Sequence, residues 1–339
     1  MPTIIDAFES TFHNTWLTQQ VPHVPFRPQL VGQMLAGEIM VEYPPSNAVQ
    51  VDVTEGRIGV LSTKPQDADP QVVGPRPLAS SFPVQSVHIP ARATIYASQI
   101  EGKRRPGEQQ MQTIARTVND RLRDMNQDFD LTFEMHRIGL LKGTVYDADG
   151  STVLFNYFNL MGKSQQTVDF AFSDSSLDVN GKTRAVQDAI EDALGGLMYD
   201  GIAVVAGKNW YDAFVSHDGV EKTYLNYAAA RTLRDDLSQA DFEFGSFDNI
   251  RRYRDTSATT LPDKIDPDEA YAFPMGVNGM FRVYWTPQRT FDTINERGRR
   301  LLVTRKLDRD HGEWVEMKGR SNPIWLNTYP DAVIKLTKS

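Results

Sequence analysis

Histidine is the commonest metal ligand among side chains, and this chain contains six of them. A zinc site needs two histidines at a fixed spacing with a supporting carboxylate, and no pair here meets that requirement. The sequence has no cysteine, so disulfides and thiolate ligands are impossible. We therefore predict no metal site. The histidines are His13, His23, His88, His136, His217 and His311.

Motifs for nucleophilic catalysis and nucleotide binding are also missing. No Gly-x-Ser-x-Gly elbow is present to expose a catalytic serine at a sharp turn. A phosphate-binding loop needs four residues between its glycines and a hydroxyl after its lysine. Five residues separate Gly201 from Gly207, and Asn209 follows Lys208. We predict no catalytic residue, no cofactor and no enzymatic activity.

Three clusters of basic residues could contact either phosphate groups or carboxylates. The chain has a formal net charge of −8, whereas proteins that wrap nucleic acid usually present a basic face. We favour ion pairs between subunits for these clusters and keep contact with phosphate as the alternative. The clusters are Lys103, Arg104 and Arg105, then Arg251 and Arg252 with Arg254, and finally Arg297 with Arg299 and Arg300.

The first 45 residues read as an extended segment that contacts other parts of an assembly. Phe8, Phe12 and Trp16 recur every four residues, which predicts a short amphipathic helix and three candidate contacts between subunits. Prolines at 22, 25 and 28 then exclude a regular helix and favour an extended chain.

A strand and a proline-rich segment follow. Valines at 49, 51 and 53 alternate with polar residues, and the Glu55-Gly56 turn leads to Val60, so we predict a hairpin over 46–60. Residues 61–99 contain six prolines, which predicts a long loop. Long loops within compact domains are usually functional, so we expect this one to reach a neighbouring subunit.

The most informative element is a helix predicted over 108–142. This stretch has no proline, and its apolar residues recur every three or four positions from Met111 to Leu140. At 1.5 Å per residue the helix would be roughly 50 Å long, which is typical of a strut. We expect its opposite face to be polar, with Asp120, Arg123, Gln127, Asp130, Glu134 and Arg137.

The remaining sequence predicts a hairpin, a mixed α/β unit and strands that return beside the long helix. The hairpin covers 144–159, with Asp147 to Gly150 as its turn. The α/β unit runs to about residue 290 and contains a short apolar strand over 201–206. The final strand candidates are 300–307, 313–318 and 332–336.

This order of elements resembles the major capsid proteins of tailed phages, the fold first associated with the Hong Kong phage. More specifically, the sequence resembles the phage capsid protein E family, to which the lambda major head protein belongs. Three stretches carry the likeness, and they are residues 51–58 with Val60 and Pro65, residues 134–143, and Tyr253-Arg254 with the stretch Phe273-Pro274 to Gly276.

The resemblance implies an α+β fold with these parts: an N-terminal arm 1–45, a peripheral hairpin 46–60, an extended loop 61–99, a peripheral domain 100–182 with a spine helix 108–142, an axial domain 183–290, and returning C-terminal strands 291–339. It implies a virion protein that assembles in the host cytoplasm, through hexamers and pentamers, into an icosahedral head around double-stranded DNA. The implied partners are further copies of the chain, a cementing protein, the portal, a scaffold and, weakly, DNA. No membrane is involved.

Two other functions fit the same sequence. An encapsulin-like compartment shell would share the fold and would hold protein cargo instead of DNA. A soluble α/β enzyme with an unrecognised site would form small discrete particles, which electron microscopy distinguishes from shells.

Overall fold

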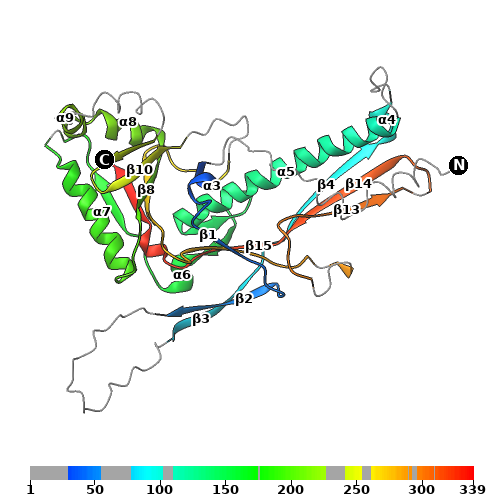
Figure 1. The fold of residues 1–339 in the computed structure, drawn as a ribbon, viewed down its shortest axis with the longest axis horizontal. Coiled ribbons are helices and arrows are strands. Elements are labelled where there is room, and N and C mark those ends of the chain that lie inside the picture. Colours follow the sequence, from blue (N-terminus) through cyan, green and yellow to red (C-terminus); the bar gives the residue numbers. More distant parts are fainter. Residues whose placement is uncertain are drawn as a thin grey trace, which may run out of the picture.

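The computed structural model describes residues 30–54, 78–101, 110–174, 176–226, 241–253, 261–288, 290–291, 296–308 and 310–339. Figure 1 shows an elongated molecule with an α/β unit at one end and a long helix beside strands at the other. A two-stranded ribbon projects from the region between them. The predicted contacts Phe8, Phe12 and Trp16 lie outside the described residues.

The α/β subdomain is built on a six-stranded sheet. The apolar strand predicted at 201–206 is present as β8, and all six of its residues are buried. β8 runs parallel to β10 on one side and antiparallel to β11 on the other. The strands in order are β7 (Thr167–Phe170), β16 (Ile334–Lys338), β11 (Glu269–Met275), β8 (Gly201–Ala206), β10 (Phe247–Arg252) and β9 (Asp241–Phe244).

Helices α7 (Val179–Leu194), α8 (Lys208–Ser216) and α9 (Asp218–Asn226) complete the α/β subdomain. Asp178 caps α7 by accepting a hydrogen bond from the amide of Gly181 at 2.9 Å. Gly195 ends this helix in the left-handed conformation, which glycine adopts without strain. The last described residue of α9 is Asn226, and residues 227–240 lie outside the described part.

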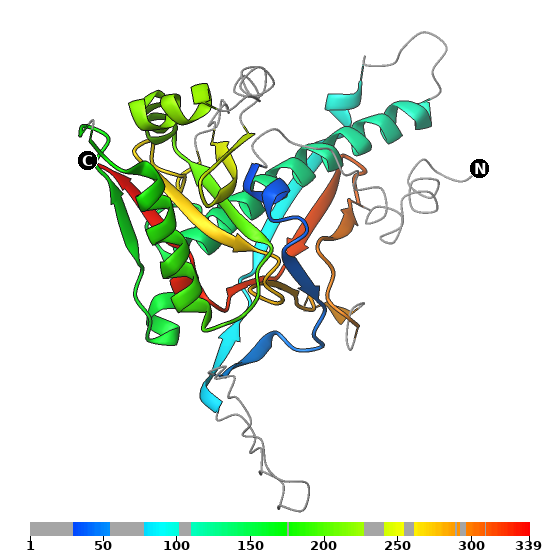
Figure 2. The same ribbon diagram turned by 60° about the vertical axis from the view of Figure 1, so that its left-hand side comes forward.

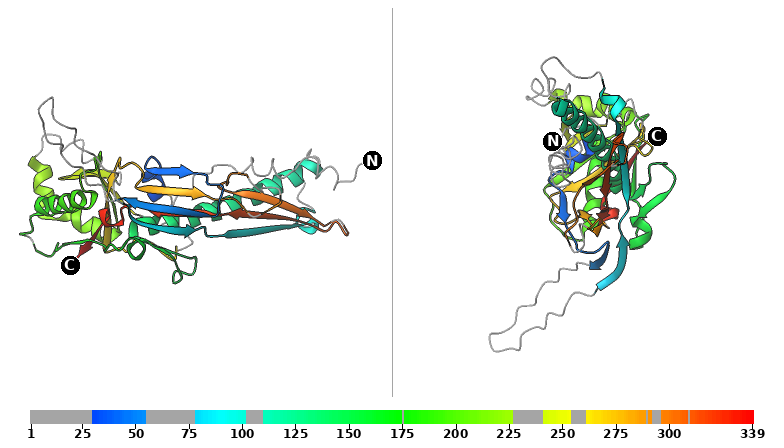
Figure 3. Two further views of the ribbon diagram at one scale, coloured as in Figure 1. Left: turned by 90° about the horizontal axis from the view of Figure 1, so that it is seen from below. Right: turned by 90° about the vertical axis from the view of Figure 1, so that its right-hand side faces the viewer.

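The long predicted helix is confirmed as α5 (Gln110–Lys142), and it lies along one face of a three-stranded sheet (Figure 3). The sheet has the order β13 (Leu302–Leu307), β14 (Trp314–Ser321) and β4 (Ile89–Tyr96). A short helix, α4 (Ala97–Ile100), follows β4. We call α5 and this sheet the wing.

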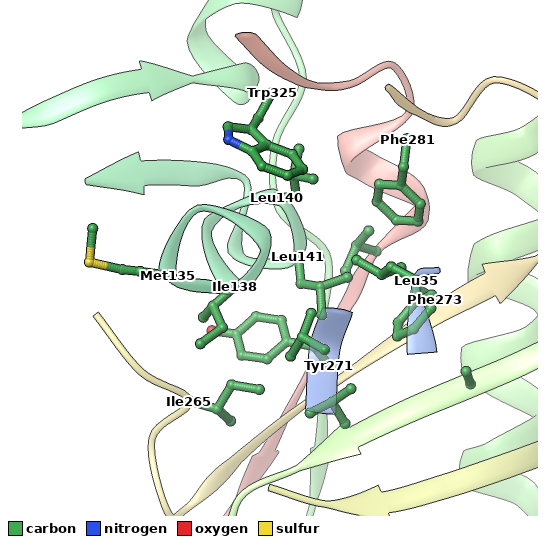
Figure 4. Packing of buried hydrophobic residues seen from close by; sticks show 14 of the residues in the cluster. Leu35, Met135, Ile138, Leu140, Leu141, Ile265, Tyr271, Phe273, Phe281 and Trp325 are labelled. Carbon is green, nitrogen blue, oxygen red and sulfur yellow. The ribbon is translucent and has the colours of Figure 1, made fainter. Parts of the chain in front are cut away.

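Another three-stranded sheet links the wing to the α/β subdomain. Its order is β1 (Ile39–Glu42), β12 (Phe281–Trp285) and β15 (Pro323–Asn327), and the short helix α3 (Leu30–Met34) precedes β1. Trp325 of β15 and Trp285 of β12 pack edge to face, with ring centroids 5.9 Å apart. Figure 4 shows apolar side chains from several elements around the last turns of α5.

The predicted hairpin after α5 is present as β5 (Thr144–Tyr146) and β6 (Val153–Asn156). It ends earlier than predicted, because residues 157–159 belong to the helix α6 (Tyr157–Met161). Gly139, inside α5, approaches β5 so closely that an added Cβ would lie 2.8 Å from the Cα of Val145. A 3-10 turn, η2 (Pro330–Ala332), packs near α6 and α7.

The projecting ribbon consists of β2 (Ala48–Thr54) and β3 (Leu78–Gln85), which pair with each other. The sequence predicted that β2 pairs with residues near Val60. In the structure its partner is β3. Residues 55–77, including the predicted return strand, lie outside the described part. The amide of Ser86 donates to the carbonyl of Asn47 at 3.0 Å, so the two ends of the ribbon are adjacent.

Two of the predicted ranges contribute strands to more than one sheet. Residues 61–99, predicted as a loop, contain β3 of the ribbon and also β4, which pairs with β14 along the wing. Of the strands in 291–339, β13 and β14 lie beside α5 as expected, whereas β16 joins the sheet of the α/β subdomain. Ile334 and Leu336 of β16 are fully buried there, and this burial explains its position.

Candidate assembly surfaces

Helix α5 is the element to which the other parts of the molecule are attached. Its apolar residues Val118, Leu122, Met125 and Phe129 are buried, as the periodicity predicted. The opposite face of the helix, which was predicted to be polar and exposed, is partly buried. Asp130 and Glu134, expected in solvent, are 2% and 0% exposed. That expectation was wrong, because segments distant in sequence cover this side of the helix.

Glu134 of α5 binds the helix α3 through hydrogen bonds. Its carboxylate accepts hydrogen bonds from the amides of Val31 and Gly32, at 2.9 and 3.0 Å, and lies 3.3 Å from the guanidinium of Arg137. Burial raises the pKa of Glu134 to about 7, although Arg137 and the two amides favour its charged form. Arg137 also lies 5.4 Å from the ring centroid of Trp325. This contact fixes the position of α3 on α5.

Asp130 holds the segment that precedes β13. It forms an ion pair with Arg300, whose guanidinium lies 5.4 Å from the ring centroid of Phe133. Burial lowers the pKa of Arg300, and Asp130 acts in the opposite direction. The predicted basic cluster at 297–300 is therefore divided, since Arg300 pairs with the buried Asp130, Arg299 pairs with Glu296 at the surface at 2.9 Å, and Arg297 is exposed.

The last residue of α5 contacts the α/β subdomain. Lys142 forms an ion pair with Asp263, in the segment between β10 and β11. Burial raises the pKa of Asp263, and Lys142 opposes this shift. Removing one member of a buried pair leaves an uncompensated charge, which makes such contacts strong constraints on geometry. One helix thus orients three separate segments.

His136 faces the interior, as the apolar stripe predicted. Its ring lies 6.4 Å from that of Trp325, and burial lowers its pKa to about 4. A buried imidazole of this kind is neutral near pH 7 and packs as part of the core.

The ribbon presents two strand edges that lack partners in the described structure. It forms its own two-stranded sheet, separate from the sheets of the body (Figure 2). An isolated two-stranded hairpin is at best marginally stable in water, and unpaired edges bind further strands or surfaces. The ribbon is therefore a candidate contact with another molecule.

Large apolar side chains are exposed at several separate positions. Phe291, between β12 and β13, is 94% exposed, and Met198, between α7 and β8, is 90% exposed. Met40 and Val41 of the edge strand β1 are about half exposed. These positions lie on different elements, and exposed apolar residues scattered in this way do not by themselves mark a binding site.

The predicted basic contacts are only partly described. Arg252 pairs with Asp212 at 3.0 Å and lies 5.9 Å from the ring centroid of Tyr211, so it is engaged within its own subunit. The side chain of Arg251 donates to that of Asn249 at 3.3 Å. Lys103, Arg104, Arg105 and Arg254 lie outside the described residues. Their role between subunits stays a prediction.

Sequence reasoning missed Asp130, Glu134 and Asp263 as internal anchors. The helical pattern held no signal for Glu134, because it places this residue on the side of α5 away from the apolar stripe. Among the described residues, no three His, Asp or Glu side chains gather so that they could hold a metal ion. No helix in this part of the chain is long and apolar enough to cross a membrane.

Comparisons with known proteins agree on one kind of molecule. The model of a family described as phage major capsid protein E matches residues 15–338. A candidate capsid protein of a prophage of Escherichia coli CFT073 is 8% identical, with a TM-score of 0.53, and the match covers 97% of this chain and 99% of that one. A phage-related protein of Bordetella bronchiseptica RB50 is 12% identical, with a TM-score of 0.51 and 96% of both chains covered. At these identities the likeness concerns the fold alone. The sequence matches none of the curated proteins with which it was compared.

Proposed function

Because the chain belongs to the phage major capsid protein E family, we propose that it assembles through hexamers and pentamers into the icosahedral head of a tailed phage. The head would enclose double-stranded DNA. The fold class expected from the sequence, the α+β fold of tailed-phage capsid proteins, is confirmed by the solved structures that the chain resembles. We also propose that the chain catalyses no reaction.

The observation that carries this proposal is the projecting ribbon. Its strands bond to each other, while its outer edges have no partner in the described structure. A free monomer would leave these edges to water, whereas a neighbouring copy could cover them. Many weak contacts of this kind become strong when a closed shell forms them all together.

We assign a role to each part of the molecule on this basis. The α/β subdomain, which contains most of residues 183–290, would be the axial domain that meets its copies around hexamer and pentamer centres. The wing would be the peripheral domain, with α5 as its spine. The ribbon would be the base of the extended loop that lies on a neighbouring subunit.

Further partners follow from the same assignment. A separate cementing protein, the portal and a scaffold would act during assembly, which would take place in the host cytoplasm. The net charge of −8 supports a weak contact with packaged DNA, because a mainly acidic surface does not retain a polyanion.

The experiment that tests this function compares the full chain with a variant that lacks the ribbon. Because Asn47 and Ser86 are hydrogen-bonded, Ala48–Gln85 can be replaced by two glycines with little strain. Electron microscopy should show closed shells for the full chain. The variant should retain its circular dichroism spectrum but sediment only as small species.

Two results would contradict the proposal. One is a full chain that stays monomeric at high concentration, and the other is a ribbon-less variant that forms normal shells. An encapsulin-like compartment would be recognised by protein cargo, instead of DNA, inside shells isolated from the cells that make them.

A further inference from the structure

The sheet of the wing has two chemically different faces. Directly opposite residues of antiparallel strands lie on the same face. Val303, Gly319 and Ala91 form one such row. A Cβ at Gly319 would lie 2.5 Å from Sδ of Met125 and 2.9 Å from the ring of Phe129, so this row faces α5.

The rows on the other face are basic. Lys318 lies directly between Arg92 of β4 and Thr304 of β13, and Arg320 is two residues further along β14. The next row contains Lys306 and Glu316. The side chain of Arg92 is 69% exposed and lies 3.6 Å from Glu316. Lys318 and Arg320 form no ion pair within the described residues. Adjacent like charges such as Arg92 and Lys318 destabilise a sheet unless an anionic partner covers them.

The exposed side of α5 carries acids at matching intervals. Asp120, Asp124 and Asp128 follow one another by four residues, and all three are exposed. Arg123 and Arg121 approach Asp120 and Asp124 only at 3.5 and 3.7 Å, as surface pairs of little strength. Asp128 has no ion pair among the described residues. Its pKa is raised, chiefly by burial and then by the charge of Asp124.

The charged side chains on the two surfaces have similar spacings. Carboxylates four residues apart on a helix are about 6 Å apart along its axis, and Lys318 and Arg320 are about 7 Å apart along their strand. They also lie on opposite sides of the same wing, since α5 covers the other face of the sheet (Figure 3). Two different complementary surfaces on one molecule produce a head-to-tail contact, and such contacts form a ring where the rotation between neighbours closes.

We propose that the basic face formed by Arg92, Lys306, Lys318 and Arg320 docks on the Asp120–Asp124–Asp128 stripe of a second copy of this chain. The contact would set neighbouring wings side by side around a capsomer, so it rests on the proposed function and names the surfaces involved. Nucleic acid is a less suitable occupant of the same face. Glu316 stands among the cations and would oppose phosphate.

A charge exchange tests the proposal in the full chain. Lys318→Glu with Arg320→Glu, and separately Asp124→Lys with Asp128→Lys, should each raise the concentration needed for assembly by roughly tenfold or more, because like charges would then face each other. The combination of all four changes should restore assembly. Sedimentation velocity measures the oligomers, and circular dichroism verifies folding of each variant.

A matched control reverses cations on the helix face. Arg121→Glu with Arg123→Glu makes that face more acidic, so assembly should persist, whereas general disruption of the helix surface would abolish it. If the Lys318→Glu, Arg320→Glu variant assembles like the unaltered chain, or if the fourfold variant assembles no better than the double ones, the proposal is wrong. Normal assembly with lost binding of a 30-base-pair DNA duplex would assign the face to nucleic acid instead. Failure of the unaltered chain to assemble would contradict the proposed function itself.

Discussion

Glu134 is the residue whose environment differs most clearly from the one that the sequence pattern predicts. Helical periodicity places it beside Asp130 and Arg137 on a polar face, and the periodicity itself is correct. The pattern reports only which residues share a face of one helix. It does not report that α3 and the segment before β13 return to cover that face, because those contacts join residues more than 100 positions apart.

We predict that replacement of Glu134 by glutamine changes how the free energy of unfolding depends on pH. The folded-state pKa of about 7 lies above the ordinary value of 4.5, so the folded chain binds the proton more tightly than the unfolded chain. The contribution of Glu134 to the free energy of unfolding therefore falls as the pH rises from about 4.5 to about 7, by on the order of 3 kcal/mol in total. Glutamine removes this contribution.

Urea denaturation at several pH values, below the concentration of assembly, measures the effect. The stability of the unaltered chain relative to Glu134→Gln should fall across that window and stay level above it. The exposed Glu296, replaced by glutamine, provides the control. A relative stability of Glu134→Gln that is constant from pH 4 to 8 would show that the carboxylate is not held as described.

At the scale of elements, long amphipathic or wholly apolar segments were predictable and short segments with mixed signals were not. The sequence predicts α5 and β8 because each repeats one pattern without interruption. Strand β15 was missed because Pro323 looks like a break, although proline is tolerated as the first residue of a strand. Strand β4 was absorbed into a predicted loop because Pro90 stands near its start, although it pairs with β14 over eight residue positions.

The close approach of α5 to β5 predicts that Gly139 cannot be replaced. Alanine favours helix over glycine by about 1 kcal/mol in exposed positions. At Gly139 the added Cβ would instead contact the backbone of Val145 and Thr144 within 3 Å. Gly139→Ala should therefore lower the free energy of unfolding by about 1–3 kcal/mol.

Thermal and urea denaturation check this expectation. Arg123→Ala, at an exposed position of the same helix, is the comparison and should change stability by less than about 0.5 kcal/mol. Equal or greater stability of Gly139→Ala would mean that the two elements are further apart than described.

At the scale of the whole molecule, the order of elements was enough to indicate the family, but the assembly of the sheets was not predictable. The last strand, β16, lies between β7 and β11, whereas the neighbouring β13 and β14 belong to the wing. The same division decides which segment can be removed from the chain. Removal of 61–99 would delete β4 and expose the core of the wing, while removal of Ala48–Gln85 takes the ribbon together with its buried Val51 and Val84.

Hydrogen exchange in the ribbon tests the central claim, which is that its strands complete their contacts on a neighbouring copy. The amides of β2 and β3 should exchange quickly in the unassembled chain, because a two-stranded sheet with open edges is marginally stable. In assembled shells the same amides should exchange at least tenfold more slowly, while those of β8 should change little. Equal exchange of the ribbon in both states would show that it contacts no neighbour, and would contradict the account.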